Sequence, residues 1–425
     1  MRYYVRMVEG APHEYKESSG TCEDCGNSPV NHFEHYVSNS LAVWTADSLA
    51  REGSIFALIA RWTGSLFDYI EQSLLRGLSA MPFARFSREV AGATTYRSQV
   101  IWEEAIRRGI DMEHLMLFGR GTEIYRARLA GKWFYFQSLP IPHDKRSEST
   151  GWLDDKYLLK NALSRAGVPV PQVASARSLQ ESLDAVRQMG SAVIKPRSGS
   201  RGRHTSVNVR EEEDVRKAYG SARKLCRHVV VEEYLEGPVC RGTVVNGKLV
   251  GFFRATPPTV EGDGTSSIRA LIENKNAQRH ERVRDVILTE EHRHFLARKG
   301  LDDDTILPAG DTTPLTHRTG RLFGGATREM LGAEHPKLRG YLERAASVLG
   351  VSVVGFDLII GDPESDPDSQ RWGIIEANSL PYIDLHYLAL EGAPSNVASS
   401  VWDLWPAPMH SQSVDARGVR ATMSA

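Results

Sequence analysis

Residues 371–380 read RWGIIEANSL, and this stretch decides how the rest of the chain is interpreted. Its apolar run is typical of a buried strand. Near the end of the run stand Glu376 and Asn378, two side chains that can act as oxygen ligands, with one residue between them. Side chains alternate between the two faces of a strand, so positions i and i+2 point the same way. We therefore expect the strand to direct a carboxylate and an amide toward one point in space.

A second apolar run contains a carboxylate of the same kind. Residues 351–360 read VSVVGFDLII and place Asp357 inside a strand that should be buried. A buried, isolated carboxylate is costly unless it is paired or binds a metal. Together with Glu376 and Asn378 it makes three oxygen ligands on two adjacent strands, a set that suits Mg²⁺ bound to substrate phosphates. The alternative is a salt bridge or a hydrogen-bonded cluster at the strand ends.

A lysine followed by a glycine-rich loop points to phosphate. Residues 195–205 read KPRSGSRGRHT, with Lys195 at the end of an apolar strand and Gly199 and Gly202 in the loop. Such a loop can offer backbone N–H groups to phosphate oxygens, and the lysine adds a positive point charge. The alternative is an ordinary hairpin loop with solvated arginines.

The composition narrows the class of protein. In 425 residues, 52 Lys and Arg balance 53 Asp and Glu, so no overall basic field indicates nucleic acid. The longest apolar stretches, such as residues 54–62, are too short to span a bilayer, and residues 1–10 lack the apolar core of a secretory signal. Four cysteines in this length are no disulfide framework. We expect a cytoplasmic protein that binds neither nucleic acid nor membrane.

The pattern of elements predicts four segments. Residues 1–40 are polar and are expected to be irregular, and residues 41–150 are expected to form a smaller, largely helical α+β domain. Residues 151–405 are predicted to form the main α+β domain, and residues 406–425 a disordered tail.

The N-terminal segment contains a possible metal site. Cys22, Cys25, His32 and His35 supply four ligands within fourteen residues, a set suitable for tetrahedral zinc. The interval between the cysteines and the histidines is shorter than in zinc fingers, so two free cysteines in a polar loop are the alternative. If this site were the main feature, the protein would be a non-catalytic nucleotide- or zinc-binding regulatory protein.

Taken in order along the chain, these motifs resemble those of the ATP-grasp carboxylate–amine ligases, in particular the ATP-grasp domains of cyanophycin synthetases and bifunctional glutathione synthetases. The resemblance covers about residues 151–405, and residues 261–279 and 322–336 share it in detail. It rests on an ordered set of residues: Lys156, Lys195 with its loop, VVVEEYLEG at 229–237, Arg241, Asp357 and EAN at 376–378. The resemblance implies an α+β fold in which two subdomains clamp ATP between antiparallel sheets.

The resemblance also implies a role for each nucleotide-binding position. Lys156 and Lys195 would hold the ATP phosphates, and Gly199 and Gly202 would belong to a flexible loop that closes over them. The adenine would be lined by a segment that reads EEYL: Glu232, Glu233, Tyr234 and Leu235.

One position departs from the family pattern. Val239 stands where related ligases have the acid that holds the ribose hydroxyls, so Glu236 would have to replace that acid or the ribose would be weakly held.

The remaining implied roles concern the chemistry. Arg241 would face the transferred phosphoryl group and later the oxyanion, while Asp357, Glu376 and Asn378 would hold two magnesium ions. The reaction would join a carboxylate, from an amino acid or small peptide, to an amine through an acylphosphate, with release of ADP and phosphate. A kinase of the same fold that releases a phosphorylated product is the alternative.

The sequence specifies the substrates and the oligomeric state less closely than the reaction. We expect small-molecule substrates, and assembly into a homo-oligomer stays open. Asp384 and His386 either line the amine site or form a hydrogen-bonded pair within a loop.

Overall fold

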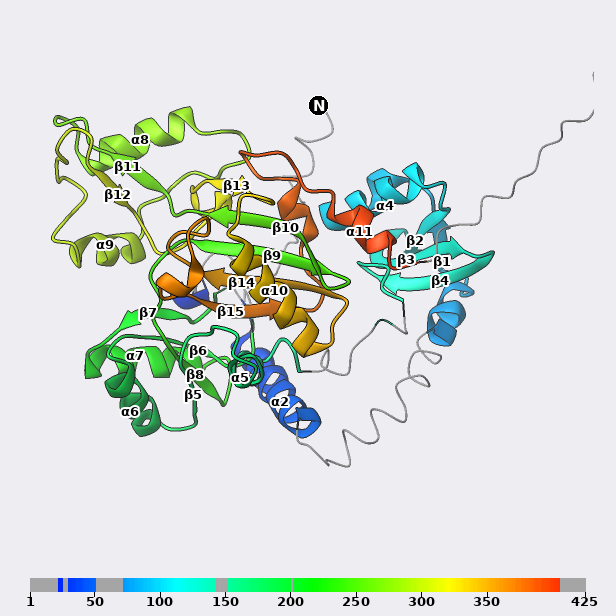
Figure 1. The fold of residues 1–425 in the computed structure, drawn as a ribbon, viewed down its shortest axis with the longest axis horizontal. Coiled ribbons are helices and arrows are strands. Elements are labelled where there is room, and N and C mark those ends of the chain that lie inside the picture. The colour runs from blue at the N-terminus through cyan, green and yellow to red at the C-terminus, as the bar shows by residue number, and fades with distance from the viewer. Residues whose placement is uncertain are drawn as a thin grey trace, which may run out of the picture.

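The computed structural model describes residues 22–25, 30–50, 72–142, 145, 152–199 and 202–405. The predicted tail at 406–425 lies outside the described residues. Figure 1 shows a central sheet, a second sheet with two helices, α6 (Leu179–Met189) and α7 (Glu212–Arg223), beside it, and a third sheet at the other side. The third sheet is accompanied by α4 (Tyr96–Arg107) and α11 (Val397–Trp402). Among the described helices, none is both long and apolar enough to cross a membrane.

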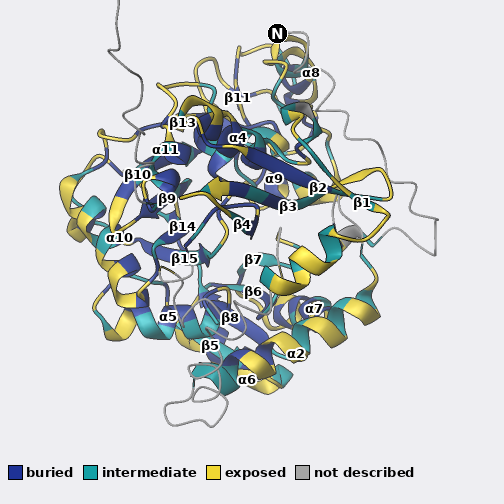
Figure 2. Cartoon of the chain, turned by 90° about the vertical axis from the view of Figure 1, so that its right-hand side faces the viewer, coloured by how far each residue is buried: buried dark blue, intermediate teal, exposed yellow. Residues whose placement is uncertain are grey.

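The central sheet has five antiparallel strands in the order β13-β10-β9-β14-β15. Its strands are β9 (Val239–Val245), β10 (Lys248–Ala255), β13 (Thr327–Glu329), β14 (Val353–Ile359) and β15 (Gly373–Asn378). Two helices, α5 (Lys156–Arg165) and α10 (Pro336–Leu349), pack against it and share its core. This core contains Phe252, Phe356 and Trp372, all nearly or fully buried. The apolar runs of the sequence therefore form the middle of the molecule, as the strands coloured buried in Figure 2 show.

The second sheet carries the glycine-rich loop. Its four antiparallel strands lie in the order β5-β8-β6-β7, with β5 (Val173–Ala176), β6 (Ala192–Pro196), β7 (Ser206–Val209) and β8 (Val229–Glu233). The helices α6 (Leu179–Met189) and α7 (Glu212–Arg223) pack on it around a separate apolar core. The glycine-rich loop joins β6 to β7.

Helix α2 (His32–Ala50) packs against this second sheet and its connections. The Asn39 side chain donates to the Leu225 carbonyl at 2.9 Å, and the Arg227 N–H donates to Ser40 Oγ at 3.0 Å. The sequence predicted an irregular segment up to residue 40, and that prediction is wrong from His32 onward. The run has no glycine or proline to stop a helix, and it buries Val43 and Ala46.

The third sheet precedes the main domain in sequence. Its antiparallel strands β1 (Ala84–Ser87), β2 (Met112–Leu117), β3 (Arg120–Leu129) and β4 (Lys132–Gln137) lie in sequence order. A helix at 72–79 and α4 (Tyr96–Arg107) accompany it. The Thr95 hydroxyl caps α4 by accepting from the Ser98 N–H.

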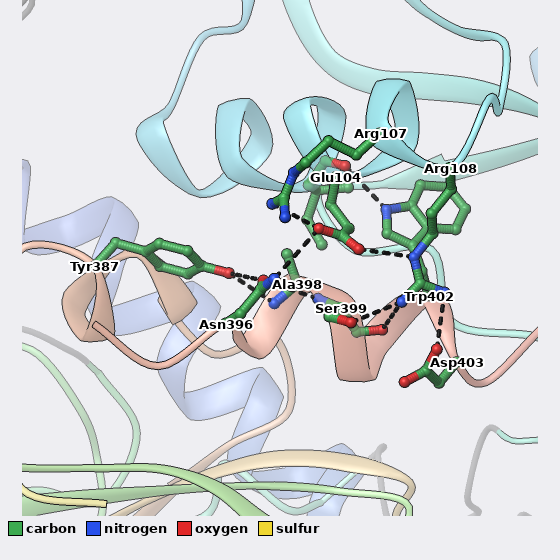
Figure 3. Close-up of polar contacts among 10 residues, drawn as sticks. Glu104, Arg107, Arg108, Tyr387, Asn396, Ala398, Ser399, Trp402 and Asp403 are labelled. Atoms are coloured by element: carbon green, nitrogen blue, oxygen red, sulfur yellow. Dashed lines mark hydrogen bonds and ion pairs between the residues drawn. The ribbon is translucent and has the colours of Figure 1, made fainter. Parts of the chain in front are cut away.

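The end of the described chain returns to this third sheet. Helix α11 (Val397–Trp402) packs on α4, and the Trp402 indole donates to the Ile101 carbonyl at 2.9 Å. Figure 3 shows the polar side of this contact, where Arg108 bridges Glu104 of its own helix to Asp403, both at 2.8 Å. The segment that follows β15 is thereby held between the central sheet and the third sheet.

A smaller lobe completes the main domain. It contains α8 (Ile268–Gln278), α9 (Glu290–Ala297) and the two-stranded sheet of β11 (Thr259–Glu261) and β12 (Thr312–Pro314). These elements share an apolar cluster of their own.

Candidate active site

Three charged side chains lie directly opposite one another across the central sheet. Asp357 of β14 pairs in register with Arg241 of β9 on one side and with Glu376 of β15 on the other. Directly opposed residues of antiparallel strands project from the same face. Arg241 donates from Nε and Nη2 to the two carboxylate oxygens of Asp357, each at 2.6 Å. The salt bridge that stayed open as the alternative for Asp357 is therefore present.

Asn378 lies on the same strand face as Glu376 because the two are separated by one residue. It pairs in register with Gly355, which has no side chain to cover it. Its amide nitrogen is buried, and no described residue is hydrogen-bonded to it. A buried donor of this kind costs free energy unless a polar partner is supplied. It is thus the sort of group that a polar ligand would satisfy.

Three lysines approach this face from the neighbouring elements. Lys195, near the end of β6, places Nζ 2.8 Å from one Glu232 carboxylate oxygen, and Lys160 of α5 places Nζ 2.8 Å from the other. Lys156, the first residue of α5, donates to the Gly199 carbonyl at 2.7 Å. The structure thus brings both predicted phosphate-binding lysines to the region between the two sheets, and it adds a third.

Lys160 is the most deeply buried of these lysines, with no exposed side-chain surface. It also donates to the Ile375 carbonyl at 2.5 Å, which connects the lysines to β15. Burial lowers the pKa of Lys160 to about 8 even though the Glu232 carboxylate works against that shift. Burial alone would raise the pKa of Glu232, but Lys160 and Lys195 outweigh it and the pKa of Glu232 lies below its ordinary value.

The Glu376 carboxylate is surrounded by positive charge. Burial works to raise its pKa, but Lys156 and Lys195 lead the nearby positive charges, which together hold the pKa of Glu376 below its ordinary value. No described residue donates a hydrogen bond to this carboxylate. An ionised carboxylate beside an acid and an amide oxygen is a donor set that fits Mg²⁺. The lysines beside it fit the phosphates that such an ion accompanies.

The glycine-rich loop is anchored at its start. Arg197 is 3% exposed and forms ion pairs with Asp155 at 2.9 Å and Asp47 at 2.5 Å. The alternative interpretation, a loop with solvated arginines, therefore does not hold for Arg197. Gly199 and Gly202 have φ of 130° and 64°, a backbone region that favours glycine. Asp155 also caps α5, so one carboxylate fixes both the loop and the helix end that carries Lys156.

The predicted adenine segment joins β8 to β9. The Glu232 side chain turns into the lysine cluster, and Glu233 pairs with Arg371 and accepts from the Gln172 N–H at 3.0 Å. Leu235 is buried and Glu236 is exposed. The carboxylates of Glu232 and Glu233 are thus engaged with the protein, which leaves the backbone of the segment for a base edge.

Two further predictions concern residues near the site. The burial of Asp384 raises its pKa, with Arg97 and Arg321 opposing that shift. His386 instead lies in a buried network, with Nε2 2.7 Å from Thr243 Oγ1 and Nδ1 2.8 Å from Glu329. No hydrogen bond between Asp384 and His386 is found among the described residues, so the predicted loop pair is absent there. Of the two residues, Asp384 stays the candidate for the amine site.

The predicted N-terminal metal set is only partly right. Cys22, Cys25 and His32 come together, but the fourth member is His204 and not His35. His32 begins α2, and His35 lies almost one turn further along the helix. His204 comes from the connection between β6 and β7 and is 1% exposed.

Two contributors were missed at the level of sequence. Lys160 lies in a helix, where a lysine is normally expected to be solvated, and the spacing of residues in that helix does not indicate that it is buried. His204 is separated from Cys25 by 179 positions, so no local motif could join them. The sequence signal for His204 was its place in the glycine-rich loop, a segment that was already predicted to bind phosphate.

Comparison with known proteins places this arrangement in context. No family model matches the chain. Cyanophycin synthetase of Synechocystis sp. is 31% identical over 260 residues, which are 59% of this chain and 30% of that protein. The bifunctional glutathione biosynthesis protein of Mannheimia succiniciproducens is 24% identical over 317 residues, 72% of this chain and 42% of that protein. The chain thus spans less than half the length of either relative.

The fold comparison agrees with the sequence comparison. The crystal structure of a bifunctional glutathione synthetase from Pasteurella multocida superposes with a TM-score of 0.52 at 24% identity, covering 74% of this chain and 44% of that one. The expected α+β fold of two subdomains is confirmed. In sequence the chain is similar to a cyanophycin synthetase and a bifunctional glutathione biosynthesis protein, and in fold it is similar to a bifunctional glutathione synthetase.

Proposed function

We propose that the protein is an ATP-dependent ligase that joins a carboxylate to an amine and releases ADP and phosphate. The observation that carries the proposal is the row Arg241–Asp357–Glu376, which lies directly across three strands and is approached by lysines from the second sheet. A phosphoryl-transfer site needs this combination of positive charge for phosphates and oxygen ligands for a metal ion.

The proposal places the chain among the ATP-grasp ligases, which use ATP and Mg²⁺. In this chain Asp357, Glu376 and Asn378 would hold magnesium, and we propose two ions. Magnesium would neutralise charge on the phosphates during transfer. Lys156 and Lys195 would add fixed positive charge from the side of the glycine-rich loop.

The reaction would run in two displacements. A carboxylate oxygen of the first substrate attacks the γ-phosphorus, the bond to the β-phosphate oxygen breaks, and ADP leaves. The amine nitrogen then attacks the acyl carbon, a proton leaves the nitrogen, and phosphate departs with the electrons of the C–O bond. Arg241 would stabilise the oxyanion of this second step, because its Nη1 is buried and no described residue accepts a hydrogen bond from it.

Water has to be excluded because it would hydrolyse the acylphosphate. The loop between β6 and β7 is suited to this task, since Gly199 and Gly202 allow backbone conformations that other residues avoid. Its contact to Lys156 would couple closure of the loop to the phosphates.

The substrate classes are proposed from the relatives, of whose length the chain covers less than half. We propose an amino acid or small peptide as the carboxylate substrate and a second amino compound as the amine, with Asp384 facing the amine. None of the described cysteines is in a disulfide, which fits the reducing cytoplasm as the place of the reaction.

A screen of amino-acid pairs for ADP release tests the proposal. We expect at least one pair to give ADP and phosphate in equal amounts with a condensation product. Glu376→Gln should remove that turnover. His35→Ala, which lies outside the candidate active site and outside the cluster of Cys22, Cys25, His32 and His204, should keep it. Formation of AMP and pyrophosphate would contradict the proposal.

A further inference from the structure

Four metal-ligating side chains meet where α2 faces the glycine-rich loop. One ligand atom from each of Cys22, Cys25, His32 and His204 lies within 4.8 Å of the others. Cys25 Sγ is 3.2 Å from His32 Nε2 and 3.3 Å from His204 Nε2, and Cys22 Sγ is 3.7 Å from His204 Nε2. Cys25 and His204 are 4% and 1% exposed. The cluster is therefore a shielded group of ligands and not a polar loop.

The spacing matches a tetrahedral ion. Zinc binds sulfur at about 2.3 Å and imidazole nitrogen at about 2.0–2.1 Å, so a sulfur and a nitrogen in one tetrahedral shell lie about 3.5–3.6 Å apart. The three sulfur–nitrogen distances here lie on both sides of that value. Two thiolates and two imidazoles form a set that favours zinc over the hard cations Mg²⁺ and Ca²⁺.

The contacts of the His204 ring orient one of its nitrogens toward the cysteines. His204 Nδ1 is 2.9 Å from the Ser221 carbonyl oxygen, which can only accept, so we assign the ring proton to Nδ1. The Nε2 atom then presents a lone pair to the cysteines. Cys25 has one thiol proton for two imidazole nitrogens, His32 Nε2 and His204 Nε2. A metal ion would satisfy both nitrogens together with both sulfurs.

The residues around the four ligands hold them in place, as the residues around a structural metal ion do. The bond from His204 Nδ1 to a backbone carbonyl is the outer contact that typically orients a metal-bound histidine. Cys22 and Cys25 are linked across η1 (Glu23–Cys25) by an N–H···O bond of 3.1 Å. The His204 N–H donates to the Asp24 carbonyl at 2.8 Å, and His204 holds φ of 51°, unusual for a residue with a side chain.

We propose that Cys22, Cys25, His32 and His204 bind one zinc ion, which fastens the N-terminal segment to the glycine-rich loop. All four positions of the tetrahedron are protein ligands, so the site is structural and holds no substrate. His204 lies two residues after Gly202, so the ion fixes the end of the loop that returns to β7. The proposal that the chain binds zinc is independent of the ligase proposal. Only the role of the loop as a lid over phosphate rests on the ligase proposal.

Metal content of the full-length chain tests the site, with His35→Ala as the matched control. We expect about one zinc per wild-type chain after reconstitution and desalting, retained in His35→Ala and lost in His204→Ala and Cys25→Ser. Retention of zinc in His204→Ala with loss in His35→Ala would overturn the proposal, because it would assign the ion to the local sequence motif.

Cobalt substitution of the wild-type chain covers the case in which a variant fails to fold. Co²⁺ bound to two thiolates and two imidazoles should give the intense visible bands of a tetrahedral site and a near-ultraviolet thiolate band. A wild-type chain that takes up neither zinc nor cobalt with reduced thiols would overturn the proposal.

Hydrogen exchange tests the connection to the loop. Removal of zinc should speed amide exchange in peptides covering both 22–32 and 202–209, with β14 unchanged as an internal control. Faster exchange confined to 22–32 would contradict the tether. None of these three measurements needs a substrate, so failure of the ligase proposal would leave their results standing.

Discussion

Lys160 and Glu232 form an ion pair of 2.8 Å between side chains that are 0% and 3% exposed. The pair connects α5, which packs on the central sheet, to β8 of the second sheet, and Lys195 shares the same carboxylate. Buried charges are tolerated only when they are paired and hydrogen-bonded. The pair therefore helps to set the position of Lys195, which we propose to bind phosphate, and ties the two subdomains together.

Replacing Lys160 by Met should lower stability. The change leaves the Ile375 carbonyl without its donor and Glu232 with one ammonium partner instead of two. We expect a loss of about 1–3 kcal/mol in the free energy of unfolding, the usual cost of an unsatisfied buried group. Urea denaturation in magnesium-free buffer measures it, and an unchanged midpoint would argue that the carbonyl and Glu232 find other partners.

The pH dependence of that difference should have a defined sign. The native pKa of Lys160 is about 8, below the value of about 10.4 for an unfolded lysine. Between these values the unfolded chain binds more protons than the native one, so the Lys160 contribution to stability rises with pH. The stability of wild type minus that of Lys160→Met should therefore be larger at pH 9.5 than at pH 7. A difference that shrinks with pH would mean that the native pKa is raised instead.

Glu376→Gln should separate catalysis from folding. The substitution keeps the shape of the side chain but removes a carboxylate that lies among Lys156, Lys195 and Arg241. We expect turnover to fall by at least about 100-fold, as removal of one charged group at a phosphoryl-transfer site does, with a thermal melt close to wild type. Normal turnover with normal Mg²⁺ dependence would remove Glu376 from the metal set.

Two glycine substitutions should act in opposite directions. A Cβ at Gly251 would lie 2.7 Å from atoms of the buried His386 ring, so Gly251→Ala should destabilise the chain by about 1–3 kcal/mol. Gly340 lies inside α10, and a Cβ added there would meet no atom within 4 Å, so Gly340→Ala should stabilise the chain by about 0.5–1 kcal/mol. Thermal unfolding of both variants measures this, and equal shifts would contradict the packing described around His386.

The parts of the site that follow local rules could be predicted from the sequence. Alternation along a strand was enough to place Glu376 and Asn378 on one face, and an acid inside an apolar run marked Asp357. Register lies beyond local rules, so the sequence did not reveal that Arg241 and Asp357 stand directly opposite each other. The same holds for His204, which meets Cys25 only because α2 packs against the second sheet.

The most direct measurement of the central claim replaces the amine by hydroxylamine. A panel of amino acids and small peptides is incubated singly with the protein, ATP, Mg²⁺ and hydroxylamine, so that only the carboxylate substrate has to be present. If the phosphoryl group of ATP passes to the carboxylate and the acyl group then passes to an amine, hydroxylamine should give a hydroxamate with the accepted carboxylate. ADP and phosphate should be released in equal amounts, and Glu376→Gln should form no hydroxamate. AMP with pyrophosphate, or a stable phosphorylated product without hydroxamate, would contradict the account.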